Sequence, residues 1–144
     1  MKLQFKPAQK SDIDIIFSLN KELIDTYENV KSIEYGKVLE WVYKKIEEHI
    51  NEYMCIIVDN QKAGYYYFHQ INEGMEIDDL YIFPEFQNKG IGTAIIKKCC
   101  SETCKPVYLY VFSGNKKAIA LYEKLGFRII KEIRDTRYLM CNVC

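Results

Sequence analysis

A strand, a loop and the start of a helix follow one another in residues 80–93, which read Leu80-Tyr81-Ile82-Phe83-Pro84-Glu85-Phe86-Gln87-Asn88-Lys89-Gly90-Ile91-Gly92-Thr93. The two glycines let the backbone approach an anion closely, and the N–H groups at a helix start attract negative charge. The loop therefore suits a pyrophosphate, although a plain helix start would also explain the two glycines. Its spacing is neither a Walker A loop nor Gly-x-Gly-x-x-Gly, because Ile95 stands where the third glycine would be.

The strand that leads into this loop changes its inward face at Asp78 and Asp79. Met75 and Ile77 are apolar at odd positions, whereas Leu80 and Ile82 are apolar at even positions. A β-bulge at the two aspartates would keep both halves facing the core, and bulges often lie beside active sites. A strand that is simply bent, or one buried on both faces, would also explain the pattern.

Outward from this stretch, the spacing of apolar residues predicts the order β-α-α-β-β-β-α-β-α-β-β. A capping box of Ser11 and Asp14 is expected before the first helix, and Gly126 is expected to end the last one. The pattern predicts an α/β (α+β) fold with a mixed, mostly antiparallel sheet of six to seven strands and about four helices. The strands are expected at 3–6, 54–58, 63–71, 75–82, 107–112, 127–131 and 137–141, and the helices at 13–27, 35–50, 90–104 and 116–125.

The length of 144 residues favours a single domain over residues 1–144. Twenty basic and twenty acidic residues balance, which disfavours a nucleic-acid binder with a broadly basic surface. The balance hides a net charge of −7 over residues 1–85 and of +7 over residues 86–144. Because we find neither an apolar leader nor a long apolar run, we expect a cytoplasmic protein that does not bind membranes.

The six cysteines are expected to be reduced thiols. Cys141-x-x-Cys144 has the spacing of redox or zinc ligands, and Cys99, Cys100 and Cys104 could add to it. This second cluster lacks the usual ligand spacing, and His49 and His69 stand alone in the sequence. We therefore expect no metal, and we interpret both histidines as ordinary surface or core residues.

Two separately placed motifs resemble the GNAT superfamily of acyl-CoA-dependent N-acetyltransferases. The first is Gln87-x-x-Gly90-x-Gly92, and the second, some twenty residues later, is Asn115-x-x-Ala118-x-x-Leu121-Tyr122-x-x-x-Gly126-Phe127. The resemblance is strong over residues 75–131, and the order of elements extends it over the whole chain. It implies a GNAT-like fold and acetyl-CoA as co-substrate.

The resemblance also implies cofactor contacts. The backbone of Leu80, Tyr81 and Ile82 would pair with the pantetheine arm like an added strand. The loop would hold the pyrophosphate, and Asn115 and Tyr122 would contact the cofactor. The cofactor-binding residues are thus expected to be Leu80, Tyr81, Ile82, Gln87, Asn88, Lys89, Gly90, Ile91, Gly92, Thr93, Asn115 and Tyr122.

By resemblance, a neutral primary amine attacks the acetyl carbonyl in a ternary complex. Tyr122 would protonate the departing thiolate, although it could instead be a core residue, and a backbone N–H near Ile82 would hold the oxyanion. Asp78 stands at the position where some members of the family carry a glutamate as general base. Glu76 or Asp79 could take this role instead, directly or through water. The glutamate that other relatives carry five residues before Asn115 is Tyr110 here.

The alternative to an N-acetyltransferase is a non-catalytic acyl-CoA-binding module. The acceptor amine, a small molecule or a peptide, would lie near Tyr27, Glu34, Tyr35, Tyr66 and Tyr67, although these aromatic residues could equally be packing. The basic half would attract the anionic cofactor and the acidic half a cationic amine. We expect a monomer or a homodimer, the latter formed through the strand at 137–141.

Overall fold

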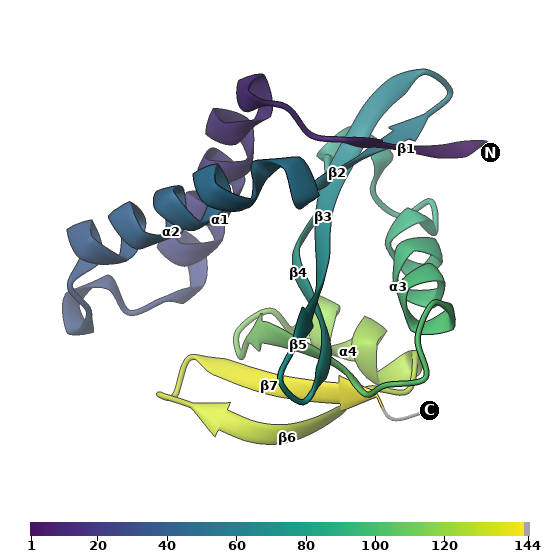
Figure 1. Cartoon of the computed structure of the whole chain (residues 1–144). Coiled ribbons are helices and arrows are strands. Elements are labelled where there is room, and N and C mark those ends of the chain that lie inside the picture. The colour runs from purple at the N-terminus through teal and green to yellow at the C-terminus, as the bar shows by residue number, and fades with distance from the viewer. Residues whose placement is uncertain (143–144) are drawn as a thin grey trace. The chain divides into compact units, whose positions relative to one another are not determined.

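The computed structural model describes residues 1–142, and its elements follow the predicted order. Figure 1 labels them along the chain. They are β1 (Leu3–Pro7), α1 (Ile13–Tyr27), α2 (Tyr35–His49), β2 (Met54–Val58), β3 (Gln61–Ile71), β4 (Gly74–Ile82), α3 (Ile91–Ser101), β5 (Val107–Phe112), α4 (Lys116–Lys124), β6 (Arg128–Ile133) and β7 (Arg137–Asn142).

Hydrogen bonds join the strands into a seven-stranded sheet in the order β1-β2-β3-β4-β5-β7-β6. The pairs β1–β2, β2–β3, β5–β7 and β6–β7 are antiparallel, whereas β4–β5 is parallel. The described residues also form four α-helices. The predicted fold class, a mixed and mostly antiparallel sheet with about four helices, is confirmed.

The chain forms two compact units. The first contains residues 1–67 and 79–85, and the second contains residues 68–78 and the chain from residue 86 onward. Strands β3 and β4 therefore contribute residues to both. In β4 the division falls between Asp78 and Asp79, the position of the predicted bulge.

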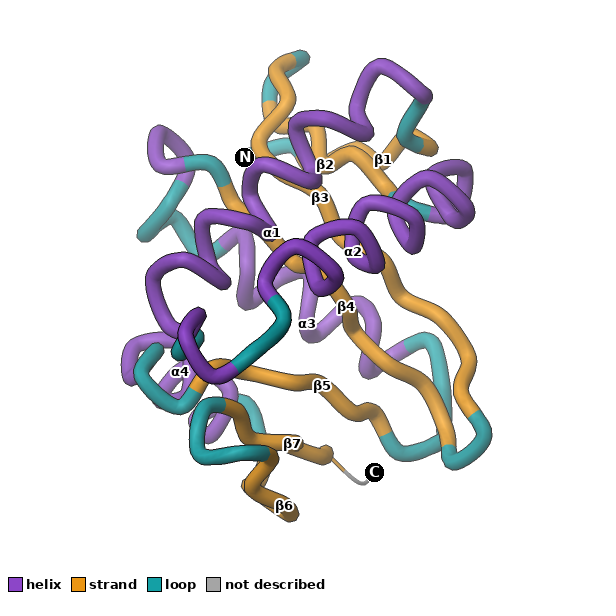
Figure 2. Tube along the Cα trace, turned by 90° about the vertical axis from the view of Figure 1, so that its left-hand side faces the viewer, coloured by secondary structure: helices purple, strands orange, loops and turns teal. Residues whose placement is uncertain are grey.

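In the first unit, α1 and α2 lie side by side (Figure 2). The apolar spacing that predicted α1 places Ile16 in the core, and Ile46 of α2 is likewise fully buried. The core also contains Tyr53 and Tyr65, both 0% exposed. The 3-10 turn over residues 50–52 follows α2, which ends at His49 rather than at Ile50.

The capping box predicted at Ser11 and Asp14 is wrong. The box is formed by Gln9 and Asp12, at a 3-10 turn that precedes α1, and the Gln9 N–H donates to Asp12 Oδ2 over 2.8 Å. Asp12 takes this place because its buried carboxylate also accepts hydrogen bonds from Lys62 (2.6 Å) and Tyr65 (2.7 Å). Contacts with residues that are distant in the sequence thus determine which residues form the capping box.

The bulge predicted in β4 is supported by the backbone, because Asp79 has a left-handed φ of 49°. Gly64 on β3 accommodates the backbone that follows. A Cβ atom on Gly64 would lie 1.9 Å from the Tyr81 carbonyl oxygen, so only glycine fits there. The adjoining hairpin of β2 and β3 turns at Asp59 and Asn60, whose φ values of 49° and 68° fit a type I′ turn.

In the second unit, Ile95 of α3 and Phe127, which follows α4, are both buried in the core. Helix α3 ends at Ser101 rather than at the predicted Cys104, because the chain must straighten before Pro106. Gly126, with φ of 96°, ends α4 as predicted.

The prediction that a homodimer would form through the strand at 137–141 is wrong. Strand β7, which contains residues 137–141, is hydrogen-bonded to β5 on one side and to β6 on the other (Figure 1). Its backbone is therefore engaged within the chain. The outer strand of this part of the sheet is β6.

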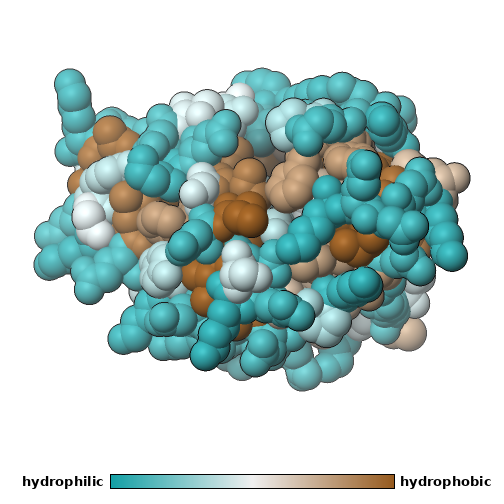
Figure 3. Space-filling model, turned by 90° about the horizontal axis from the view of Figure 1, so that it is seen from above, coloured by the Kyte–Doolittle hydropathy of each residue, from teal (hydrophilic) through white to brown (hydrophobic). Residues whose placement is uncertain are grey.

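The molecular surface seen in Figure 3 is mostly hydrophilic, with separate hydrophobic patches between polar side chains. Among the large hydrophobic side chains, Trp41 (65% exposed) and Ile130 (54% exposed) are prominently open to solvent. Scattered exposed apolar residues are normal on a globular protein. None of the helices over residues 1–142 combines the length and the apolar character needed to cross a membrane.

Candidate functional site

The loop between β4 and α3 contains two left-handed residues, Asn88 (φ 61°) and Gly90 (φ 80°). Gly90 is the N-cap of α3, and a Cβ atom there would have no neighbour within 4 Å. Glycine is therefore favoured at this position by the backbone conformation and not by lack of space. The N–H groups of the first turn, at Ile91, Gly92 and Thr93, have no acceptor within the helix and are suited to an anion.

Two lysines lie beside this loop. Lys117 Nζ of α4 donates to Asn88 Oδ1 over 3.1 Å, and Lys89 Nζ lies 5.8 Å from the centre of the Phe86 ring. Lys89 is one of the predicted cofactor-binding residues. Lys117 is not, because it stands at an unspecified position of the second motif, between Asn115 and Ala118. Its position two residues after Asn115, in the first turn of α4, was the available signal.

Helix α4 carries the second motif. Asn115 is its N-cap, and its Oδ1 accepts the Ala118 N–H over 3.3 Å. Tyr122 is half-buried, and its ring centre lies 6.1 Å from that of Phe127. Burial raises the pKa of Tyr122 to about 12, so its phenol stays protonated at neutral pH and can donate a proton.

The remaining cofactor candidates differ in exposure. Leu80, Tyr81 and Ile82 of β4 are half-buried, whereas Gln87 is exposed. The chain just beyond Ile82 is still hydrogen-bonded to β3, because the Phe83 N–H donates to the Ala63 carbonyl over 2.8 Å.

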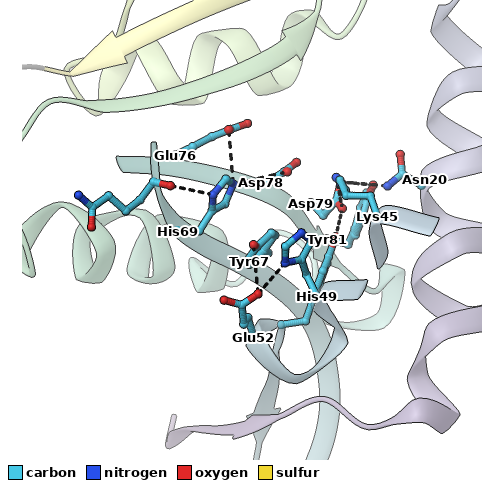
Figure 4. Close-up of polar contacts among 12 residues, drawn as sticks. Asn20, Lys45, His49, Glu52, Tyr67, His69, Glu76, Asp78, Asp79 and Tyr81 are labelled. Carbon is cyan, nitrogen blue, oxygen red and sulfur yellow. Dashed lines mark hydrogen bonds and ion pairs between the residues drawn. The ribbon is translucent and has the colours of Figure 1, made fainter. Parts of the chain in front are cut away.

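Asp78, the predicted general base, lies in a cluster with Glu76 and His69 (Figure 4). His69 Nε2 is 3.4 Å from Glu76 Oε1 and 3.8 Å from Asp78 Oδ2. The Asp78 and Glu76 carboxylates raise the pKa of His69 to about 10. Pairing of β3 with β4 brings His69 beside both carboxylates, contacts that the sequence did not predict.

Asp79 has a different environment. Its carboxylate accepts hydrogen bonds from Asn20 (3.0 Å), Tyr53 (2.5 Å) and Tyr81 (3.3 Å), and it forms an ion pair with Lys45 over 3.0 Å (Figure 4). The Asp79 side chain in this pair is only 8% exposed. So many donors stabilise the carboxylate and disfavour Asp79 as a proton acceptor.

Several residues suggested for the acceptor have packing roles. Tyr66 and Tyr67 are each 4% exposed, and Tyr67 stacks on Tyr53 with ring centres 4.7 Å apart. The Tyr35 hydroxyl donates to Asp25 Oδ1, and Glu34 forms an exposed ion pair with Lys37. Tyr27 is half-buried.

Five of the cysteines lie in the described part of the chain and are free thiols. Burial raises the pKa of Cys55 to about 11 and that of Cys99 to about 12, so neither is a reactive thiolate at neutral pH. Cys141 is buried on β7, while Cys104 is exposed. Cys144 lies outside the described residues.

Several known proteins are similar to this chain. A stretch of 74 residues is 38% identical to the thialysine N-epsilon-acetyltransferase of Sus scrofa, covering 47% of this chain and 44% of that protein. The match thus spans less than half of the relative's length. Acetyltransferase PseH of Campylobacter jejuni is 28% identical over 141 residues, which cover 94% of this chain and 88% of PseH.

The fold is also found in solved structures. The PaiA N-acetyltransferase of Thermoplasma acidophilum, crystallised in complex with coenzyme A, superposes with a TM-score of 0.70 at 18% identity and covers 100% of both chains. At this identity the likeness concerns the fold alone. The model of the acetyltransferase (GNAT) family, however, matches residues 16–127, which is most of the chain. The chain therefore belongs to the GNAT family of acetyltransferases.

Proposed function

We propose that this protein is an N-acetyltransferase that moves the acetyl group of acetyl-CoA to a primary amine. The observation that carries the proposal is the loop at the start of α3, where left-handed Gly90 is the N-cap and the first-turn N–H groups that follow are suited to an anion. The proposal assigns the pyrophosphate to residues 87–93 and the pantetheine arm to the backbone of Leu80, Tyr81 and Ile82. Residues 1–144 would act as one catalytic domain.

The chemistry is a direct transfer in a ternary complex. The amine nitrogen attacks the thioester carbonyl carbon, the new C–N bond forms, and the C–S bond breaks to release the thiolate of coenzyme A. Tyr122, whose phenol is protonated at neutral pH, donates its proton to this thiolate. The amine loses its proton to Asp78, directly or through water.

Asp78 suits the role of base better than its neighbour does. Asp79 is held by four donor side chains, whereas Asp78 Oδ2 lies 3.8 Å from Nε2 of the His69 ring. Asn115 would contact the cofactor while its Oδ1 caps α4.

The acceptor is expected to be a primary amine, because the matched stretch of the Sus scrofa relative belongs to an enzyme named for an ε-amine. The test is a panel of amines, including thialysine, spermidine and peptides with free N-termini, incubated with acetyl-CoA and analysed by mass spectrometry. An acetylated amine supports the proposal. Binding of coenzyme A with no acetylated product over the whole panel favours a non-catalytic acyl-CoA-binding module.

A further inference from the structure

The cluster of His69, Glu76 and Asp78 lies on one face of the β3–β4 hairpin. Counting back from the two-residue turn at Asn72 and Glu73 places His69 opposite Glu76. Asp78 follows two residues later, so its side chain lies on the same face as that of Glu76. The three side chains are half-buried, and their nearest nitrogen and oxygen atoms all lie within 4.8 Å of one another.

The three side chains form a close polar cluster. His69 Nε2 lies 3.4 Å from Glu76 Oε1 and 3.8 Å from Asp78 Oδ2. The other histidine provides a reference within the same chain, because His49 Nδ1 lies only 2.7 Å from Glu52 Oε2. The His69 ring nitrogen thus lies further from its two carboxylates than the His49 ring nitrogen lies from its one.

These longer separations match the spacing of ligands around a metal ion. Zinc lies roughly 2.0–2.2 Å from nitrogen and oxygen ligands, so neighbouring ligand atoms of a tetrahedral site are about 3.3–3.6 Å apart. The 3.4 Å separation falls within this range, and the 3.8 Å separation exceeds it by a few tenths of an ångström. The Glu76 and Asp78 oxygens lie within 4.8 Å of each other, so rotation of the side chains is needed to bring all three donors to one ion.

The second ring nitrogen of His69 has the partner expected at a metal site. His69 Nδ1 lies 3.3 Å from the Gln70 carbonyl oxygen. Metal-binding histidines almost always donate their other ring N–H to a carbonyl or carboxylate, which fixes the ring and the tautomer. This arrangement leaves Nε2 to face the two carboxylates, as Figure 4 shows.

We propose that His69, Glu76 and Asp78 form a binding site for a divalent transition-metal ion, with Zn²⁺ as the best match. Metal binding displaces the imidazolium proton of His69 to solvent, and the neutral imidazole and two carboxylates that remain supply two negative charges, which balance the ion. This nitrogen and oxygen donor set suits zinc. The partial exposure of all three side chains leaves room for a water molecule as fourth ligand. This site goes beyond the proposed acetyl transfer, and it is an alternative to the expectation that the chain binds no metal.

A bound ion has a consequence for Asp78. A carboxylate oxygen that coordinates a metal no longer accepts a proton from an amine. Occupancy of the site would therefore slow any reaction that uses Asp78 as its base.

The test is titration of the purified, metal-free protein with Co²⁺, followed by visible absorption and by competition with Zn²⁺. Acetyl-CoA and amine are left out, so the result does not depend on acetyltransferase activity. We expect one ion per chain, a cobalt spectrum without the near-ultraviolet band of thiolate ligation, and displacement of cobalt by zinc. His69→Ala should weaken binding at least about 100-fold, and Glu76→Gln at least about tenfold, given the losses that even outer partners of a ligand cause.

The matched control is His49→Ala, which removes a histidine paired with a carboxylate in ordinary hydrogen-bond geometry and should leave metal affinity unchanged. Glu76→Gln preserves the size of the side chain, so it removes a metal ligand without disturbing the packing. Circular dichroism checks that each variant is folded. Three results would overturn the proposal. They are no stoichiometric binding, equal affinity in the wild type and both cluster variants, and a thiolate band showing that cysteines hold the ion.

Discussion

Asp78 and Asp79 are adjacent in the sequence but have different surroundings. Asp79 is tied to Asn20, Lys45, Tyr53 and Tyr81, as expected of a structural anchor. Asp78 faces the ring of His69 instead. The left-handed backbone at Asp79 separates the two environments, because it interrupts the regular alternation of side chains along β4. Asp79 thus has the contacts of a structural residue, while Asp78 is the residue proposed as the general base.

Tyr122→Phe is expected to lower kcat at least about tenfold, the usual range for a lost general acid. The phenol is the proton donor in the proposed reaction, while its ring, near Phe127, stays in place. The affinity for coenzyme A should therefore change little. Steady-state kinetics and calorimetry measure the two quantities, and a variant with full turnover would remove Tyr122 from the mechanism.

Asp12→Asn is expected to destabilise the protein by about 2 kcal/mol at pH 7, in the range for buried hydrogen bonds to a charged group. Although burial raises the pKa of Asp12, hydrogen bonds from Lys62, the Gln9 N–H and Tyr65 lower it overall. A lowered pKa in the folded state contributes stability above the unfolded pKa of about 3.9, and this contribution is lost as the pH falls through the folded value.

Urea denaturation at a series of pH values tests this prediction. The difference between the wild type and Asp12→Asn should be largest near neutral pH and should shrink below about pH 4. Asp14→Asn is the matched control, because Asp14 is exposed and its substitution should change stability by less than about 0.5 kcal/mol. A constant difference across the series would contradict the role assigned to the ionised Asp12.

At the scale of elements, the sequence predicted each helix and strand to within a few residues. The strand, loop and helix of residues 75–101 could be recognised because glycine spacing and apolar alternation are local signals. Local signals did not identify the cap of α1, which depends on the contacts of Asp12 with Lys62 and Tyr65. The contacts of His69 were missed for the same reason, since only the register of β3 against β4 brings it to Glu76.

Gly90→Val should weaken the binding of coenzyme A at least about tenfold, because a β-branched residue with positive φ is a genuine backbone outlier. Gly90→Asn should have a smaller effect, since asparagine tolerates the left-handed conformation. The space around a Cβ atom at Gly90 is open, so a steric clash does not confuse the comparison. Calorimetry with coenzyme A measures all variants.

Gly36→Ala serves as the control, because Gly36 lies within α2 and a Cβ atom there also meets nothing within 4 Å. It should leave coenzyme A affinity unchanged. Equal affinities for Gly90→Val, Gly90→Asn and the wild type would show that the loop conformation is not needed for the cofactor.

At the scale of the whole molecule, the charge is zero in total but divided along the chain. The net charge of +7 over residues 86–144 belongs to the part that contains Lys117 and the loop of residues 87–93, which is proposed to hold the pyrophosphate. An anionic cofactor is attracted to such a surface, and salt screens the attraction. The composition alone, with its balanced charge, concealed this feature.

The affinity for coenzyme A is therefore expected to fall at least about threefold between about 0.05 M and about 0.5 M salt, as the Debye length shortens. Lys117→Met should weaken binding and reduce this salt dependence. Lys37→Met, which removes an exposed lysine of α2, is the control and should behave as the wild type. Affinity that is independent of ionic strength would mean that the charge division has no part in binding.

The most direct measurement of the proposed activity is the rate of free thiol release from acetyl-CoA with and without a primary amine. An N-acetyltransferase predicts release that depends on the amine, saturates with its concentration, matches the amount of acetylated product and falls in Tyr122→Phe. Tight binding of coenzyme A without any amine-dependent release, across the panel of amines, would contradict acetyl transfer by this chain.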